Sequence, residues 1–323
     1  MTGVGNETLG LKQQATLTYS WRVGGLRLEF RVFDVPTLLY LIIWIVLMLS
    51  AWERLASPWF YLAFHLLFIT NIFLFAAYPV QHPLAGFFRQ FYLVLYVPLF
   101  FTALHYLIPA VHPRTIDDWL IRWDLILLGD HATVLTEKIT YPLLTEYLQW
   151  CYTSFYFLPA VVAGVLYSRK QFRHLDYFIT LIAMGFYLSY LGYVIFPALG
   201  PRFFLAHLQQ IPLKGVWAFD AIQNTLNSLE NIQWDAFPSG HTAIVLVLFY
   251  YTFRYHRKLF QWIFPFGAPL IFSTVYLRYH YFVDVVAGGL LALVTIRITN
   301  LLIRRLFPDW CPATDTHHGG AGP

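Results

Sequence analysis

Two residues that lie four apart, His280 and Asp284, have the spacing of an acid–base pair. They belong to 276-YLRYHYFVDVVAGG-289, where a polar stretch gives way to an apolar run. On a helix, residues at i and i+4 share a face, and a carboxylate that accepts from imidazole Nδ1 leaves Nε2 free. This arrangement suits a nucleophilic histidine. The alternative is a structural pair that stabilises the helix start, because an aspartate in a membrane helix needs a partner.

A second histidine, His241, stands at the start of another apolar run, in 235-DAFPSGHTAIVLVLFYY-251. Ser239 follows a proline and precedes the run, so it is a candidate N-cap. The free N–H groups that follow, from Gly240 onward, form a seat for an anion such as phosphate. His241 would stand beside that phosphate and could give a proton to a leaving oxygen. The alternative is a capped helix with an interfacial histidine.

Two arginines complete the set. Arg202 lies in 197-PALGPRFF-204, and Arg278 lies two residues before His280. Arginine suits bidentate contact with phosphate oxygens, although either side chain alone could be an interfacial anchor. We therefore predict a phosphate-transfer site in which the binding groups are Arg202, Ser239, Gly240 and Arg278.

The elements that must hold these residues are membrane helices. The chain has 323 residues, of which 58% are hydrophobic and only 12% are charged, whereas soluble domains carry about 25% charged residues. A membrane-spanning helix needs about 20 apolar residues. We expect an all-α, polytopic membrane bundle of about eight helices, at 35–52, 58–79, 87–111, 145–167, 175–196, 239–254, 260–278 and 281–303.

The distribution of Lys and Arg predicts the orientation of this bundle. Alternate loops carry twelve of these residues on one side and seven on the other, which favours a cytosolic first side. Both termini would then be cytosolic, and all three motif segments would face outward from a plasma (inner) membrane. The same loop residues account for the net charge of +4, so no nucleic-acid partner is expected.

Two long connections, 112–144 and 197–238, lie on the predicted outward side. In the first, Ile116, Leu120 and Trp123 recur at helical spacing with Leu127 and Leu128. This stripe predicts an amphipathic helix over 116–130 in the membrane interface. It is either a lid that packs on the bundle or an element that contacts substrate.

Pro-Ser-Gly-His followed by His-x-x-x-Asp resembles the type 2 phosphatidic acid phosphatase superfamily of membrane lipid phosphatases and phosphotransferases. The resemblance covers about 87–303, the six helices typical of the family, and makes the first two helices an addition. The expected parts are a cytosolic segment, two additional helices, a six-helix catalytic core and a disordered tail, at 1–34, 35–86, 87–307 and 308–323.

The resemblance implies a two-step transfer. His280 would attack phosphorus and form a phosphohistidine, oriented by Asp284. His241 would protonate the departing alcohol oxygen, and water or another alcohol would then take the phosphoryl group. The family uses no metal, and no cofactor is implied.

The sequence departs from the family pattern at the arginines. The usual Lys and Arg-Pro of the first motif are absent around Arg202, and Ser273-Thr274 stands where Ser-Arg is usual. Arg278 lies closer to His280 than the family arginine does, so the phosphate-holding arginines do not carry over one for one.

The pattern Pro-x-x-Gly-Pro-Arg that ends at Arg202 resembles the branch that contains inositol phosphorylceramide synthases and their bacterial relatives. The leading hypothesis is a lipid phosphatase acting on a lipid phosphate or pyrophosphate in the bilayer. A headgroup phosphotransferase that uses the same site is the first alternative. A non-catalytic lipid-binding or transport protein is the second.

Overall fold

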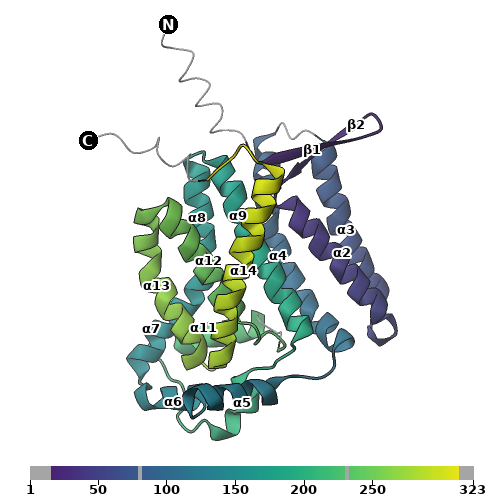
Figure 1. Cartoon of the computed structure of the whole chain (residues 1–323). Helices are drawn as coiled ribbons and strands as arrows, with labels where there is room; N and C mark the ends of the chain where they lie inside the picture. Colours follow the sequence, from purple (N-terminus) through teal and green to yellow (C-terminus); the bar gives the residue numbers. More distant parts are fainter. Residues whose placement is uncertain (1–15, 79–81, 230–232, 313–323) are drawn as a thin grey trace, which may run out of the picture.

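The structure, a computed structural model, describes residues 16–78, 82–229 and 233–312. Most of the chain is helical, and long helices run side by side between two ends (Figure 1). The helices are α2 (Asp34–Ser50), η1 (Trp52–Arg54), α3 (Pro58–Ala77), α4 (Pro83–Val111), α5 (Asp117–Leu128), α6 (Ala132–Leu135), η2 (Thr136–Ile139), α7 (Pro142–Thr153), η3 (Ser154–Tyr156), α8 (Leu158–Ser168), α9 (Phe172–Ile195), α10 (Pro201–Phe204), η4 (Ala206–Leu208), α11 (Phe219–Leu229), α12 (Gly240–Tyr255), α13 (Arg257–Tyr276) and α14 (Phe282–Leu306).

The expected eight membrane helices are supported in part. Within the described residues, α3, α4, α9, α13 and α14 are long and apolar enough to cross a membrane, and α7 with α8 makes a sixth if that bent pair is one span. The helix expected over 145–167 is broken there by 46°. Pro159, near the start of α8, has no N–H to donate to the preceding turn. The remaining two expected helices, α2 and α12, have only 17 and 16 residues.

The N-terminal segment contains a β-hairpin that was not predicted from the sequence. Strands β1 (Thr18–Val23) and β2 (Leu26–Arg31) pair antiparallel, and β2 packs on α3. The turn is Gly24-Gly25, with Gly24 at φ +61°, a conformation that glycine adopts without a steric cost. A two-residue Gly-Gly turn between β-prone runs is a hairpin signal, so the sequence did contain the information. We call this end of the bundle the hairpin end and the opposite end, where α5 lies, the site end (Figure 1).

The two helices expected as an addition share a core with the rest of the bundle. Tyr40 of α2 stacks on Tyr187 of α9, with ring centroids 4.4 Å apart. Phe68 of α3 lies edge-on to Tyr96 of α4, with centroids 4.1 Å apart. Aromatic pairs of this kind add to the free energy gained by burial alone, so α2 and α3 are packed against α4 and α9.

A buried carboxylate joins the hairpin to the bundle at the hairpin end. Asp176 of α9 is fully buried and accepts hydrogen bonds from the Leu17 N–H at 2.7 Å, the Gln90 side chain at 2.8 Å and Arg31 at 3.0 Å. Buried charges persist in proteins when they are paired in this way. The hairpin, α4 and α9 are thereby held to one another.

Part of the expected tail is packed. Trp310 is buried beside Tyr177, with ring centroids 5.7 Å apart. Residues 313–323 of the predicted disordered tail lie outside the described residues.

Candidate active site

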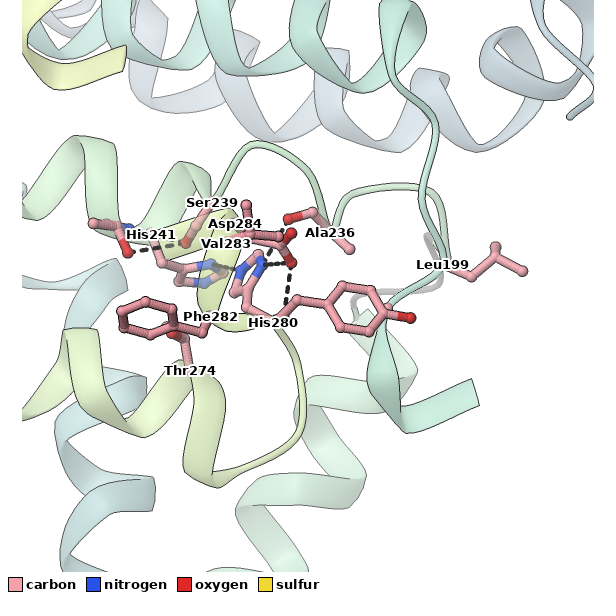
Figure 2. A network of polar contacts seen from close by, with 12 residues as sticks. Leu199, Ala236, Ser239, His241, Thr274, His280, Phe282, Val283 and Asp284 are labelled. Carbon is pink, nitrogen blue, oxygen red and sulfur yellow. Dashed lines mark hydrogen bonds and ion pairs between the residues drawn. The ribbon is translucent and has the colours of Figure 1, made fainter. Parts of the chain in front are cut away.

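The three motif segments meet at the site end. Nε2 of His280 lies 3.5 Å from Nδ1 of His241, and Figure 2 shows the two rings side by side with Asp284 behind His280. His280 is only 3% exposed and Asp284 is fully buried. His241 and His280, which are 39 positions apart in the sequence, are therefore neighbours, because α12 and α14 begin at the same end of the bundle.

His280 is oriented through its Nδ1 atom. The carbonyl oxygen of Ala236 lies 2.7 Å from Nδ1, and a carboxylate oxygen of Asp284 lies 3.4 Å from it. Two acceptors facing Nδ1 favour the tautomer with hydrogen on Nδ1, which leaves the Nε2 lone pair free toward His241. The contribution of Ala236 was not predicted, because a backbone carbonyl in a loop leaves no sequence signal.

Asp284 has a second contact that stabilises the helix start. The same carboxylate oxygen accepts from the Tyr281 N–H at 2.8 Å, as part of a capping box at the start of α14. The two interpretations from sequence, an orienting residue and a structural pair, therefore describe one side chain that has both sets of contacts.

Ser239 is the N-cap of α12, as predicted from sequence. Its hydroxyl accepts from the Thr242 N–H at 3.3 Å, and its own N–H donates to the Asp284 carbonyl at 3.0 Å. Gly240 follows at a close approach, since a Cβ at this position would collide with the Tyr193 hydroxyl. The start of α12, with its free N–H groups and positive dipole end, is thus fixed beside the histidine pair.

His241 is held by aromatic rings from the break between α7 and α8. Its ring stacks on Tyr152 at a centroid distance of 4.7 Å and lies 4.3 Å from Phe155. Its Nε2 is buried and has no hydrogen-bond partner among the described residues. Neither aromatic residue was predicted from the sequence, because the break between α7 and α8 that brings them here was itself not predicted.

The two arginines are placed differently. The guanidinium of Arg202 lies over the ring of Tyr279, the residue before His280, 5.1 Å from its centroid. Burial raises the pKa of the nearby Asp235, and the positive charge of Arg202 opposes that rise. Arg278 forms an ion pair with Glu137 at 2.9 Å and also donates to the Ile211 carbonyl. The structure thus brings Arg202 to the site and engages Arg278 with the neighbouring loops.

Burial lowers the pKa of His280 from its ordinary 6.5 to about 4, against the opposing effects of the Asp235 charge and the Ala236 carbonyl. The folded protein therefore binds fewer protons than the unfolded chain between pH 6.5 and 4. We expect this residue to reduce the free energy of unfolding as pH falls through that window, by up to about 1.4 kcal/mol per pH unit.

Thermal unfolding of the wild type and of His280→Gln at several pH values measures this effect. The stability difference should change between pH 6.5 and 4 and be constant above 7. A difference that does not vary with pH would mean that His280 has an ordinary pKa.

A profile of the PAP2 superfamily matches residues 118–298, which is more than half of the chain. The chain belongs to the PAP2 superfamily. The match spans the segments that carry both histidines, Asp284 and both arginines, and it begins at α5. No curated protein and no solved structure shows a significant match to the chain. The match concerns the superfamily, and the narrower branch predicted from the arginines stays a prediction.

In this PAP2 protein the helix α5 braces the site through two buried aspartates. Asp117 accepts from the Gly200 N–H at 2.8 Å, the Leu199 N–H at 3.0 Å and the Tyr281 hydroxyl at 2.9 Å. It therefore joins the loop that precedes Arg202 to the loop that follows His280.

The second aspartate, Asp124, caps the start of α14. It accepts from the Val283 N–H at 2.8 Å and from the Phe282 N–H at 3.0 Å. These are N–H groups that a helix start leaves unpaired. The N-terminus of α14 is therefore occupied by a carboxylate, and the N-terminus of α12 is the one beside the histidine pair.

The inward face of α5 differs from the predicted stripe. Leu120 is buried as expected, but Trp123 and Leu127 are exposed, whereas Asp117 and Asp124 are buried. The inward face was predicted wrongly because Asp117 and Asp124 bind N–H groups of distant loops, and the periodicity of apolar residues within one helix carries no information about such partners. The helix itself was correctly predicted, its place in the membrane interface stays a prediction, and its contacts here hold two loops of the site.

Asp124→Ala is expected to lower the free energy of unfolding by about 1–2 kcal/mol, the usual range for losing a capping side chain, because alanine leaves the Phe282 and Val283 N–H groups without their acceptor. Asp118→Ala, on the exposed side of the same helix, is the matched control and should change stability little. Thermal unfolding in detergent would compare them. Equal midpoints for the two variants would contradict the bracing role of Asp124.

Proposed function

We propose that this PAP2 protein is a membrane-embedded lipid phosphatase that works through a phosphohistidine on His280. The observation that carries the proposal is the facing pair, with His280 Nε2 at 3.5 Å from His241 Nδ1. His280 Nδ1 is held from behind by Ala236 and Asp284. One imidazole is thus oriented as a nucleophile, and a second stands where a proton can be given or taken.

In the first step, Nε2 of His280 forms a bond to phosphorus. The bond between phosphorus and the lipid-side oxygen breaks, and His241 gives its proton to that oxygen. In the second step, water attacks the phosphohistidine and passes a proton to His241, so that phosphate is released and both histidines are restored. Asp284 keeps His280 oriented throughout.

The phosphoryl oxygens need a positive environment in both steps. Arg202 and the N–H group of Gly240 are the proposed donors, because the Ser239 N–H is already bonded to the Asp284 carbonyl. The place of the Arg202 guanidinium over the ring of Tyr279, the residue before His280, supports its part in this. Arg278 was predicted for the same role from sequence. It would have to exchange Glu137 for the phosphate, so we place Arg202 first.

Headgroup transfer is the second candidate, supported by the Pro-x-x-Gly-Pro-Arg pattern that ends at Arg202. If the headgroup stays on phosphorus when the bond to the lipid-side oxygen breaks in the first step, an alcohol that replaces water in the second step gives a new phosphodiester. If only the phosphoryl group is carried on His280, the alcohol gives a new phosphate monoester. A lipid-binding or transport function without catalysis is the third candidate, but it does not explain why the two histidines are oriented toward each other.

Product analysis with purified protein separates these functions. A panel of phosphatidic acid, a prenyl pyrophosphate, a phosphatidylglycerol phosphate and a phosphatidylinositol would be incubated with and without an excess of alcohol. Free phosphate that is insensitive to the alcohol supports the phosphatase. A new ester formed at its expense supports transfer, and the absence of both products would refute catalysis on these substrates.

We also propose eight membrane crossings, cytosolic termini and an outward-facing site in the plasma (inner) membrane. The excess of Lys and Arg in loops at the hairpin end supports this orientation. The site end carries the exposed Trp119 and Trp123 of α5, residues that favour a membrane interface. Accessibility of cysteines introduced in the Gly24-Gly25 turn and near Trp119 to a membrane-impermeant thiol reagent would test it.

A further inference from the structure

An apolar cavity of about 270 Å³ runs along the bundle and ends at His241. Its floor is α9, and α4 and α8, which both pack on α9, contribute its two sides. At the site end the cavity is lined by Asp235, Gly240 and His241, and at the hairpin end by Gln90. The wall between these ends is almost entirely hydrocarbon and aromatic.

The length of the cavity follows from the floor helix. Phe178 and Tyr193 of α9 both line it, and they are 15 residues apart in the helix. At a rise of 1.5 Å per residue this is about 22 Å, most of the roughly 30 Å hydrocarbon thickness of a bilayer. The cavity therefore has the length of a lipid chain that lies along the membrane normal.

The cavity is reached from the side on which lipid would lie. Val94 of α4, Tyr156 of η3 and Ala160 of α8 line it and are exposed at the surface of the bundle. Gln90, in contrast, is buried and closes the far end of the cavity. Its side-chain amide already donates a hydrogen bond to Asp176 at 2.8 Å.

We propose that this cavity binds one hydrocarbon chain of the substrate, which enters between α4 and α8 and places its phosphate at His241. This rests on the proposed function and names the part of the lipid that the site recognises. An apolar wall with a few polar groups at one end fits a ligand with that same division. The helix α4 lies outside the residues matched by the PAP2 profile, so one side of this chain site comes from the segment that precedes the matched region.

Narrowing the cavity tests the proposal without disturbing the core. Ala160→Trp places a large ring in the cavity from an exposed position, and Val161→Trp is the matched control, because Val161 is exposed on α8 and does not line the cavity. For a long-chain alkyl phosphate, we expect Ala160→Trp to raise KM roughly 10-fold or more through lost burial of methylene groups. For a short water-soluble phosphate monoester, KM and kcat should stay within about twofold of the wild type, because that ligand leaves the cavity wall unused.

In the wild type, KM should fall as the chain is lengthened until it reaches Gln90 and should then level off. If Ala160→Trp and Val161→Trp behave alike on the long-chain substrate while phosphate is released normally, the cavity proposal is wrong and the phosphatase proposal stands. If no substrate is turned over, the phosphatase proposal fails, and the cavity needs a readout other than activity.

That readout is photolabelling of the full chain in detergent, with an alkyl phosphate that carries a diazirine at the end of its chain. Labels should fall on α4 and α9 near Gln90 and Phe178, and Ala160→Trp should reduce them while Val161→Trp should not. Labels confined to the outer surfaces of α3 or α13 would overturn the proposal, whether or not the protein has activity.

Discussion

His280→Gln is expected to reduce phosphate release from a lipid phosphate by a factor on the order of 10⁴ to 10⁶, the scale on which an enzyme loses rate when its nucleophile is removed. Glutamine keeps a polar group that can donate to the Ala236 carbonyl, but it has no basic nitrogen in the place of Nε2. The variant should therefore fold and bind the substrate while it fails to form the phosphoenzyme.

The measurement is phosphate release together with trapping of an acid-labile phosphoenzyme by rapid quench. His65→Gln is a matched control, because His65 is also buried and its Nδ1 also faces a backbone carbonyl, that of Tyr61, but it lies in α3. That control should keep its turnover and its phosphoenzyme. A His280→Gln protein with near-normal turnover, or a phosphoenzyme located at another residue, would refute the mechanism.

His241→Gln is expected to show a loss that depends on the leaving group. With an alkyl phosphate, turnover should fall by about 10² to 10⁴, the range for removing a general acid. With an aryl phosphate, whose phenolate leaves without a proton, the first step should be much less affected. Breakdown of the phosphohistidine still needs His241 to take a proton from water, so the intermediate should accumulate.

The expected record is a burst of phenol close to one equivalent per protein, followed by slow release of phosphate, as in other covalent mechanisms. A second variant, His241→Ala, would show whether the glutamine amide of His241→Gln itself contributes to the remaining turnover. If both variants lose the same factor with alkyl and aryl substrates and no phosphoenzyme accumulates, then His241 acts only by holding His280 in place.

What the sequence predicted well was local or was fixed by topology. Ser239 caps α12 because a serine after proline at the start of an apolar run has few other roles. His241 and His280 meet because both stand at helix starts that alternate crossings bring to one end. The helix α5 was predicted from its periodicity, although the residues on its inward face were not.

What the sequence did not predict depends on partners far away in the chain. Three examples are the Ala236 carbonyl, the Tyr152 ring and the N–H groups bound by Asp117. Nothing in the local sequence around any of them indicates which residue it contacts. The ion pair between Arg278 and Glu137 joins positions 141 apart. A single sequence gives the residue types, and their pairing follows only from how the helices pack.

The buried contact between Arg31 and Asp176 has a consequence for how the chain is threaded through the bilayer. Because the two side chains touch at 3.0 Å, residues 31 and 176 lie on the same side of the membrane, and the number of crossings between them must be even. If α3, α4 and the bent α7–α8 pair each cross once, parity requires α2 to cross as well, although it has only 17 residues. A single ion pair at the end of the bundle therefore constrains how many times the N-terminal half of the protein crosses the membrane.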